Sequence, residues 1–149
     1  MNNFYLKIAD EQDVEFLIDV LILSDPDEPD ANTSLIKQCK IRVLADIRTQ
    51  MPNNITYVIE RDGYQVGRLR LVETDKELYI GGIQLLPAYQ GLGLGSSIIC
   101  SLITKACESN KNLQLEVQKN NTKAKKLYLR LGFTVEQVLE FEEVMVKNP

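Results

Sequence analysis

Residues 85–96 read Leu85-Leu86-Pro87-Ala88-Tyr89-Gln90-Gly91-Leu92-Gly93-Leu94-Gly95-Ser96. A β-prone segment over residues 77–86 precedes the glycines, and a helical stripe follows them at Leu94, Ile98, Leu102, Ile103 and Ala106. The glycines therefore stand between a strand and a helix, where unpaired N–H groups and the positive end of the helix dipole converge. Because glycine leaves the backbone open to phosphate oxygens, a pyrophosphate is the natural ligand.

Two nucleotide-binding interpretations of this turn fit poorly. A P-loop requires Gly-Lys-Ser/Thr after the last glycine, and the lysine is absent. A Rossmann site matches Gly91 and Gly93, and Glu116 lies about twenty residues further on, where an acid binds the ribose. Ser96 replaces the third glycine, however, and residues 87–90 lengthen a turn that should be tight. Glycines that only turn the chain remain a further interpretation of this motif alone.

A second motif lies downstream and consists of Leu115-Glu116-Val117, Asn121-x-x-Ala124-x-x-Leu127-Tyr128 and Gly132-Phe133. The glycine turn resembles the acyl-CoA loop of the Gcn5-related N-acetyltransferase (GNAT) family, which reads Gln/Arg-x-x-Gly-x-Gly/Ala after a strand and a proline. The second motif is similar to the C-terminal signature of that family, and most similar to its ribosomal-protein N-acetyltransferases. The two motifs cover residues 77–133, whereas residues 1–76 match the family only in the order of their elements.

The resemblance implies that acetyl-CoA is the acyl-donor cosubstrate and that no metal is needed. Its pantetheine arm is expected to pair with the backbone of Ile83 to Leu85, as an added strand would. Asn121 is expected to cap a short helix, and Ala124 is small enough for the arm to lie across that helix. The residues expected to contact the cosubstrate are Ile83, Leu85, Gln90, Gly91, Leu92, Gly93, Leu94, Gly95, Ser96, Asn121 and Ala124.

Tyr128 is the expected general acid, because a phenol with a pKa near 10 is protonated at pH 7 and suits a departing thiolate. The acceptor must attack as a neutral amine, yet a lysine-like amine is neutral in only about one molecule in 2,500 at pH 7. Glu116 lies twelve residues before Tyr128 and by resemblance is the general base, provided that burial raises its pKa or water relays the proton. Glu73 and Gln84 are weaker substitutes for this role.

The order of predicted elements supports one α/β domain with a mixed sheet over residues 1–149. A strand at 4–8 and helices after Asp10 and at 34–48 come first. A hairpin follows, with strands at 55–61 and 65–73 joined across Asp62-Gly63. Further strands are expected at 77–86, 113–117, 133–138 and 142–147, with a helix at 122–131. The resemblance implies a GNAT-like fold, whose central sheet is mostly antiparallel and carries helices on both faces.

Composition excludes several classes of function. A net charge of −4 with no basic patch disfavours nucleic-acid binding. No long apolar run or basic leader is present, so a cytoplasmic location without membrane contact is expected. The chain has no histidine and no Cys-x-x-Cys spacing, so no metal site is expected. The three cysteines, Cys39, Cys100 and Cys107, are expected to be buried, reduced thiols.

The expected function is acetyl transfer from acetyl-CoA to a primary amine by direct attack in a ternary complex. An acidic segment at Asp25, Asp27, Glu28 and Asp30 is a candidate attractant for a cationic amine, although such segments are usually only solvated. Small-molecule and protein or peptide amines remain open as acceptors, and the resemblance permits a homodimer. The alternative is a catalytically silent acyl-CoA-binding regulatory or interaction module.

Overall fold

The structure is a computed structural model that describes residues 3–24 and 33–149. The strands in these ranges are β1 (Tyr5–Ile8), β2 (Asn54–Arg61), β3 (Tyr64–Glu73), β4 (Glu77–Leu85), β5 (Asn112–Gln118), β6 (Thr134–Val138) and β7 (Glu142–Lys147). The helices are α1 (Val14–Leu23), α2 (Thr33–Arg48), α3 (Leu94–Glu108) and α4 (Thr122–Arg130), with short 3-10 turns η1 (Glu11–Asp13) and η2 (Pro87–Tyr89). The acidic residues 25, 27, 28 and 30 lie outside the described residues.

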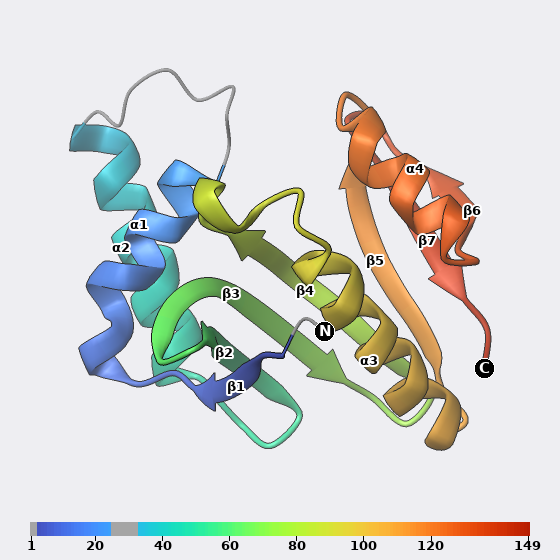
Figure 1. Cartoon of the computed structure of the whole chain (residues 1–149), viewed down its shortest axis with the longest axis horizontal. Helices are drawn as coiled ribbons and strands as arrows, with labels where there is room; N and C mark the ends of the chain where they lie inside the picture. Colours follow the sequence, from blue (N-terminus) through green and yellow to red (C-terminus); the bar gives the residue numbers. More distant parts are fainter. Residues whose placement is uncertain (1–2, 25–32) are drawn as a thin grey trace. The chain divides into compact units, whose positions relative to one another are not determined.

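The seven strands form one sheet with the order β1-β2-β3-β4-β5-β7-β6 (Figure 1). β4 and β5 run parallel, whereas the β1–β2, β5–β7 and β6–β7 pairs are antiparallel. This arrangement confirms the predicted α/β class and the predominance of antiparallel pairs in a mixed sheet.

Two compact units make up the chain. The first consists of Met1–Leu71 and Gly82–Gly95, and the second of Val72–Gly81 and Ser96–Pro149. β3, β4 and α3 each begin in one unit and end in the other.

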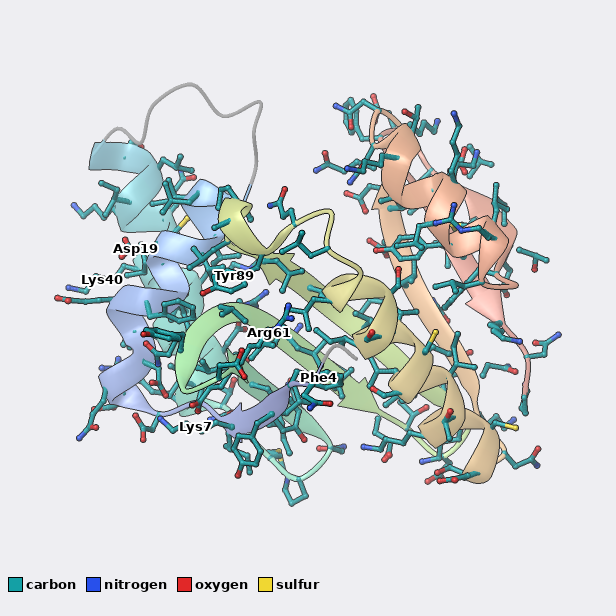
Figure 2. All side chains as sticks on the ribbon, in the orientation of Figure 1. Phe4, Lys7, Asp19, Lys40, Arg61 and Tyr89 are labelled. Atoms are coloured by element: carbon teal, nitrogen blue, oxygen red, sulfur yellow. The ribbon has the colours of Figure 1, made fainter. Side chains whose placement is uncertain are left out.

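In the first unit, α1 and α2 lie side by side and pack with β2 around one apolar cluster (Figure 1). The buried members of this cluster are Ala9, Leu17, Ile18, Val43, Ile47 and Val58. Asp19 of α1 and Lys40 of α2 are exposed and point away from the strands of this unit (Figure 2). The two helices therefore show the expected amphipathic pattern, with one apolar stripe buried and charges outside.

Asp10 caps the first helical segment, as the sequence predicts. Its Oδ1 accepts a hydrogen bond from the Gln12 backbone N–H at 2.9 Å, while Asp13 Oδ2 accepts one from the Asp10 N–H at 2.9 Å. These reciprocal bonds form a capping box that satisfies two donors left unpaired at a helix start. The capped turn is the 3-10 segment η1, and α1 follows it directly.

The connection between β2 and β3 is Asp62-Gly63, and both residues have positive φ, at 53° and 82°. A two-residue turn with positive φ at both positions matches the predicted type I′ hairpin. The boundaries of the two strands differ from the prediction by one residue at most.

In the second unit, the first half of β4 pairs with β5 from Glu77 opposite Asn112 to Ile80 opposite Leu115. β5 also pairs with β7 along its whole length, from Leu113 opposite Lys147 to Gln118 opposite Glu142. The buried side chains of this unit come from both strands and helices: Leu78, Ile80, Ile98, Ile99, Leu102, Ala106, Leu113, Leu115, Val117, Phe133, Val144 and Met145.

The prediction that the cysteines are buried is wrong. Cys100 and Cys107 are exposed and Cys39 is half-buried, although all three are free thiols. Cys100 and Cys107 lie two turns apart on the outward side of α3, because the buried stripe of that helix passes through Ile98, Leu102 and Ala106.

In the described ranges, no helix combines the length and apolarity needed to cross a bilayer.

Candidate active site

The glycine turn in the first unit is anchored at both ends. Pro87 occupies the start of η2, and the Leu86 N–H donates to the Val66 carbonyl at 2.9 Å. Gln90 Nε2 donates to the Leu85 carbonyl at 2.9 Å and to the Ser24 carbonyl at 3.2 Å. Gln90 is an expected acetyl-CoA contact, and in the structure its side chain ties the turn to the end of β4 and to the end of α1.

The turn itself needs glycine at two positions. Gly91 and Gly93 have φ values of 73° and 83°, a region that other residues rarely adopt. A Cβ added to Gly91 would meet no atom within 4 Å, so the space beside this residue is open. Leu94 follows fully buried and begins α3, which places the start of a fifteen-residue helix directly after the turn. Open backbone beside a helix start is the arrangement expected for a pyrophosphate site.

Tyr128 lies on α4 in the second unit. Its ring packs against Phe133 with a centroid separation of 5.8 Å and an interplanar angle of 58°. The contact depends on Gly132, whose φ of 102° lets the chain turn back so that the Phe133 N–H donates to the Tyr128 carbonyl at 3.0 Å. Burial raises the pKa of the Tyr128 phenol above its ordinary value. A phenol is protonated at neutral pH with or without this shift, so Tyr128 has a proton to donate.

Glu116 lies on β5, on the face opposite the buried side chains of Leu115 and Val117. It is exposed, yet its pKa is raised, first by hydrogen bonding with the Glu142 carboxyl on β7, and then by desolvation and the charge of Glu142. The sequence led us to expect burial as the cause, and burial is only the second cause. A raised pKa makes Glu116 a stronger base than an ordinary glutamate.

Asn121 caps α4, as predicted. Its Oδ1 accepts a hydrogen bond from the Ala124 N–H at 3.2 Å. Lys125, on the same turn, forms an ion pair of 2.7 Å with Glu143 of β7. These contacts fix the first turn of the helix that carries Tyr128.

The predicted residues thus form two groups. Ile83, Leu85 and residues 90–95 belong to the first unit, whereas Ser96, Glu116, Asn121, Ala124 and Tyr128 belong to the second. Within the first group Gly95 lies near Leu85, since a Cβ added to Gly95 would be 3.8 Å from Leu85 Cδ1.

A family model described as the acetyltransferase (GNAT) family matches residues 18–133, which is more than half of the chain. The chain belongs to the GNAT acetyltransferase family. It is therefore an acetyltransferase that transfers an acetyl group from acetyl-CoA to an amine. No curated protein matches it in sequence.

Solved structures of N-acetyltransferases share the GNAT fold of this chain. PaiA N-acetyltransferase from Thermoplasma acidophilum, in complex with coenzyme A, is 16% identical with a TM-score of 0.79, and the match covers 99% of each chain. PseH from Campylobacter jejuni, in complex with acetyl coenzyme A, is 20% identical with a TM-score of 0.67 over 98% of this chain and 99% of that one. The ribosomal-protein-S18-alanine N-acetyltransferase of Escherichia coli is 18% identical with a TM-score of 0.70, covering 97% and 91%.

The two alternatives to Glu116 as a base are engaged elsewhere in this GNAT chain. Glu73 forms an ion pair of 3.5 Å with Lys111, and Gln84 Oε1 accepts a hydrogen bond of 2.9 Å from Arg68. Arg68 itself is a residue that sequence analysis missed. An arginine between the apolar neighbours Val66, Leu69 and Leu71 of one strand was the available signal, because arginine is rarely buried without a partner.

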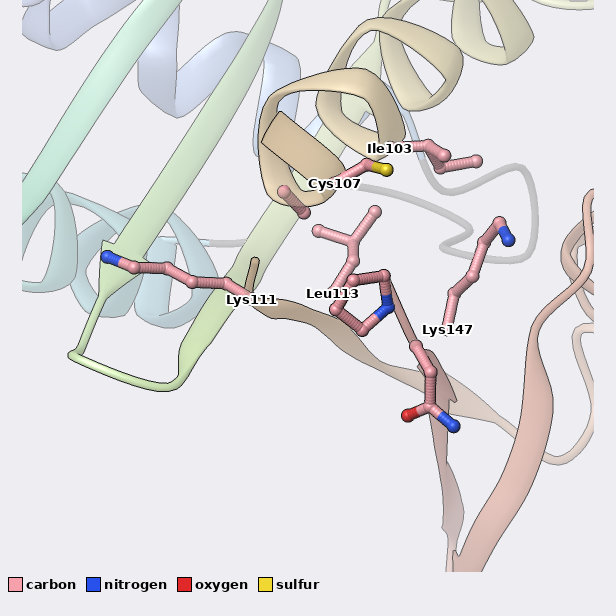
Figure 3. Close-up of a pocket in the computed structure, with 8 residues that line it drawn as sticks. Ile103, Cys107, Lys111, Leu113 and Lys147 are labelled. Carbon is pink, nitrogen blue, oxygen red and sulfur yellow. The ribbon is translucent and has the colours of Figure 1, made fainter. Parts of the chain in front are cut away.

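Two cavities of the GNAT chain lie away from the predicted residues. One, of about 60 Å³, is lined by residues of α3, β5 and the C-terminal segment, including Ile103, Cys107 and Lys147 (Figure 3). The other, of about 290 Å³, is an open depression beside Ile8 and Met51. The first is too small for a substrate, and none of the predicted site residues lines either cavity, so neither changes the assignment of the site.

Proposed function

We propose that residues 1–149 form a single N-acetyltransferase domain that acetylates a primary amine by direct attack, with Tyr128 as the general acid and Glu116 as the general base. The observation that carries this proposal is the position of Tyr128 on α4, inside the region that matches the family, with its ring packed against Phe133. Acetyl-CoA is placed by Ile83, Leu85 and the turn from Gln90 to Ser96, with Asn121 and Ala124 beside the pantetheine arm.

The proposed chemistry moves one proton onto Glu116 and one off Tyr128, and exchange with solvent returns both side chains to their starting states. Glu116 accepts a proton from the acceptor amine as its nitrogen bonds to the acetyl carbon. Tyr128 donates its proton to the sulfur as the carbon–sulfur bond breaks, so that free coenzyme A leaves as a thiol. Holding amine and thioester together supplies much of the remaining rate acceleration.

The experiment is the release of coenzyme A thiol from acetyl-CoA in the presence of separate amines: polyamines, aminoglycosides, amino acids and peptides with free N-termini. Tyr128→Phe is expected to lower turnover by about 10²-fold or more while acetyl-CoA binding persists. Tyr64→Phe, at an exposed tyrosine, is the matched control and should keep full turnover. Turnover unchanged in Tyr128→Phe would refute the assignment of the general acid.

A catalytically silent acyl-CoA-binding module is the second candidate, and the glycine turn alone would suffice for it. The match of residues 18–133 to the acetyltransferase family favours the enzyme. Binding of acetyl-CoA without turnover of any amine would favour the module. The name of the Escherichia coli relative, a ribosomal-protein-S18-alanine N-acetyltransferase, makes a protein amine one candidate acceptor. The cytoplasmic location and the homodimer remain predictions.

A further inference from the structure

Arg68 and Arg70 share the carboxylate of Asp46 in the first unit, and we call these three residues together with Arg42 the arginine cluster. Arg68 Nη2 donates to Asp46 Oδ2 at 3.2 Å, and Arg70 Nε lies 3.7 Å from Asp46 Oδ1. Arg42, on α2, is close enough for its charge to lower the pKa of Arg68. The cluster therefore joins α2 to β3.

The cluster carries more positive charge than its partners neutralise. The Arg68 side chain is 0% exposed, and desolvation, followed by the charge of Arg42, lowers its pKa to about 10 against the opposing effect of Asp46. Among the charged residues that act on Arg68 in the described ranges, Asp46 is the only acid. The Nε atoms of Arg68 and Arg70 are buried and make no hydrogen bond. Asp46 offsets part of the cost of burying Arg68, and one carboxylate faces more than one guanidinium group.

The position of the cluster connects it to the proposed donor site. Arg68 Nη1 donates to Gln84 Oε1 at 2.9 Å, and Gln84 stands between Ile83 and Leu85, whose backbone we assign to pantetheine. Side chains alternate along a strand, so Gln84 projects to the face opposite Ile83 and Leu85. Gly82 leaves room for this arrangement, because a Cβ there would lie 2.6 Å from Arg68 Nη1.

Two of the three arginines reach the surface. Arg42 is exposed and the Arg70 side chain is 25% exposed, whereas Arg68 lies enclosed behind them. An oxyanion at the surface would pair with the guanidinium group of Arg70, and the charges of Arg42 and Arg68 would strengthen the attraction. Guanidinium groups match carboxylate and phosphate geometry with paired hydrogen bonds.

We propose that the arginine cluster binds an oxyanion group, a carboxylate or a phosphate, of the acceptor, so that the preferred acceptor is an anionic amine. This inference rests on the proposed function, because it treats the bound amine as the acetyl acceptor. Binding of the anion itself does not depend on turnover. It differs from the expectation of a cationic acceptor, which rested on acidic residues outside the described ranges.

The test compares Arg70→Gln with Arg61→Gln. Both arginine side chains are 25% exposed and each forms an ion pair with an aspartate, at 3.7 Å for Arg70 and 4.0 Å for Arg61. Each variant therefore removes one similar charge, but only Arg70 belongs to the cluster. Arg42→Gln, at an exposed residue, repeats the test in case Arg70→Gln lowers stability too far.

The first measurement is kcat/KM for matched amines: amino acids against their carboxamides, and O-phosphoethanolamine against ethanolamine. We expect the anionic member to be preferred in the wild type, and the preference to fall by roughly 10- to 100-fold in Arg70→Gln but not in Arg61→Gln. Differences in the pKa of the two amines cancel, because each ratio is compared between variants. The pair of amines whose preference falls in Arg70→Gln shows whether the cluster binds a carboxylate or a phosphate.

The second measurement is the rise in Tm caused by succinate or inorganic phosphate over sodium chloride at equal ionic strength. A bound anion stabilises the folded state, so the rise should be present in the wild type and Arg61→Gln and lost in Arg70→Gln. If no amine is turned over but this pattern appears, the anion site stands and the proposed function fails. Equal responses to the anions in all variants, or no preference for anionic amines in an active wild type, would overturn the proposal.

Discussion

Gly67→Ala is expected to displace the segment of β4 that we assign to the donor. Gly67 lies on β3, and a Cβ at this position would lie 2.5 Å from the Gln84 carbonyl oxygen, 2.8 Å from Leu85 Cδ2 and 3.1 Å from Ile59 Cδ1. A leucine methyl can rotate away, but a backbone carbonyl can move only with its strand. The substitution therefore acts on the backbone between Ile83 and Leu85.

The size of the effect follows from these distances. Ordinary van der Waals contact begins at 3.4 Å, so the carbonyl must move by about 0.9 Å, the difference between 3.4 and 2.5 Å. Overpacking of this kind costs about 1–3 kcal/mol, and the lower chain entropy of alanine offsets about 0.5–1 kcal/mol of it. The net loss in the free energy of unfolding should be about 1–2 kcal/mol. For a chain of this length, this corresponds to a Tm lower by about 2–8 °C.

The assay combines urea unfolding with calorimetric titration of acetyl-CoA. Turnover should fall further than stability alone requires, because a misplacement near 1 Å can cost about 10²-fold in rate. Gly95→Ala is the control for stability: its Cβ would lie 3.8 Å from Leu85 Cδ1, and alanine favours a helix, so unfolding should be unchanged or harder. If Gly67→Ala keeps wild-type stability and acetyl-CoA affinity, the tight approach of β3 to β4 does not constrain the site.

Three further outcomes are expected. Asn121→Ala should lower the free energy of unfolding by about 1 kcal/mol in urea titrations through loss of the α4 cap, whereas Asn120→Ala should not. Glu142→Gln should move the acidic limb of the pH profile of kcat/KM to lower pH, because Glu142 raises the pKa of Glu116; an unmoved limb would contradict Glu116 as the base. The raised pKa of Glu116 stabilises the fold only below the pKa of this residue in the unfolded chain, and this contribution is lost as pH rises through the folded pKa. Near pH 7, Glu142→Gln should therefore have a higher free energy of unfolding than wild type. The gain should be less than about 1 kcal/mol, because Glu116 is exposed. Gly93→Glu should abolish acetyl-CoA binding in calorimetry by closing the turn and repelling phosphate; retained affinity would remove the turn from the site.

Local signals account for the parts of the fold that sequence analysis predicted well. Asp10 and Asn121 cap helices through their own side chains, and Asp62-Gly63 sets a hairpin through positive φ. Each of these features depends on residues within a few positions of one another, so the sequence contains the whole cause. The glycine turn is predictable for the same reason.

Contacts between distant positions account for what sequence analysis missed. Glu142 raises the pKa of Glu116, but the two are brought together only by the register of β5 with β7. Arg68 meets Asp46 of α2 and Gln84 of β4, which lie 22 and 16 positions away. The exposure of Cys100, by contrast, was predictable, because the apolar stripe named from the sequence is the buried one and does not pass through position 100.

Gln84 connects the two sides of the proposed chemistry. Its carbonyl lies against Gly67, in the backbone segment assigned to the donor, while its side chain accepts from Arg68 in the cluster assigned to the acceptor. Two glycines on neighbouring strands make this possible, since Gly67 admits the carbonyl and Gly82 admits the guanidinium. Gln84 thus contacts the neighbouring strand through its backbone carbonyl and the arginine cluster through its side chain. Donor position and acceptor recognition are therefore expected to change together when either glycine gains a side chain.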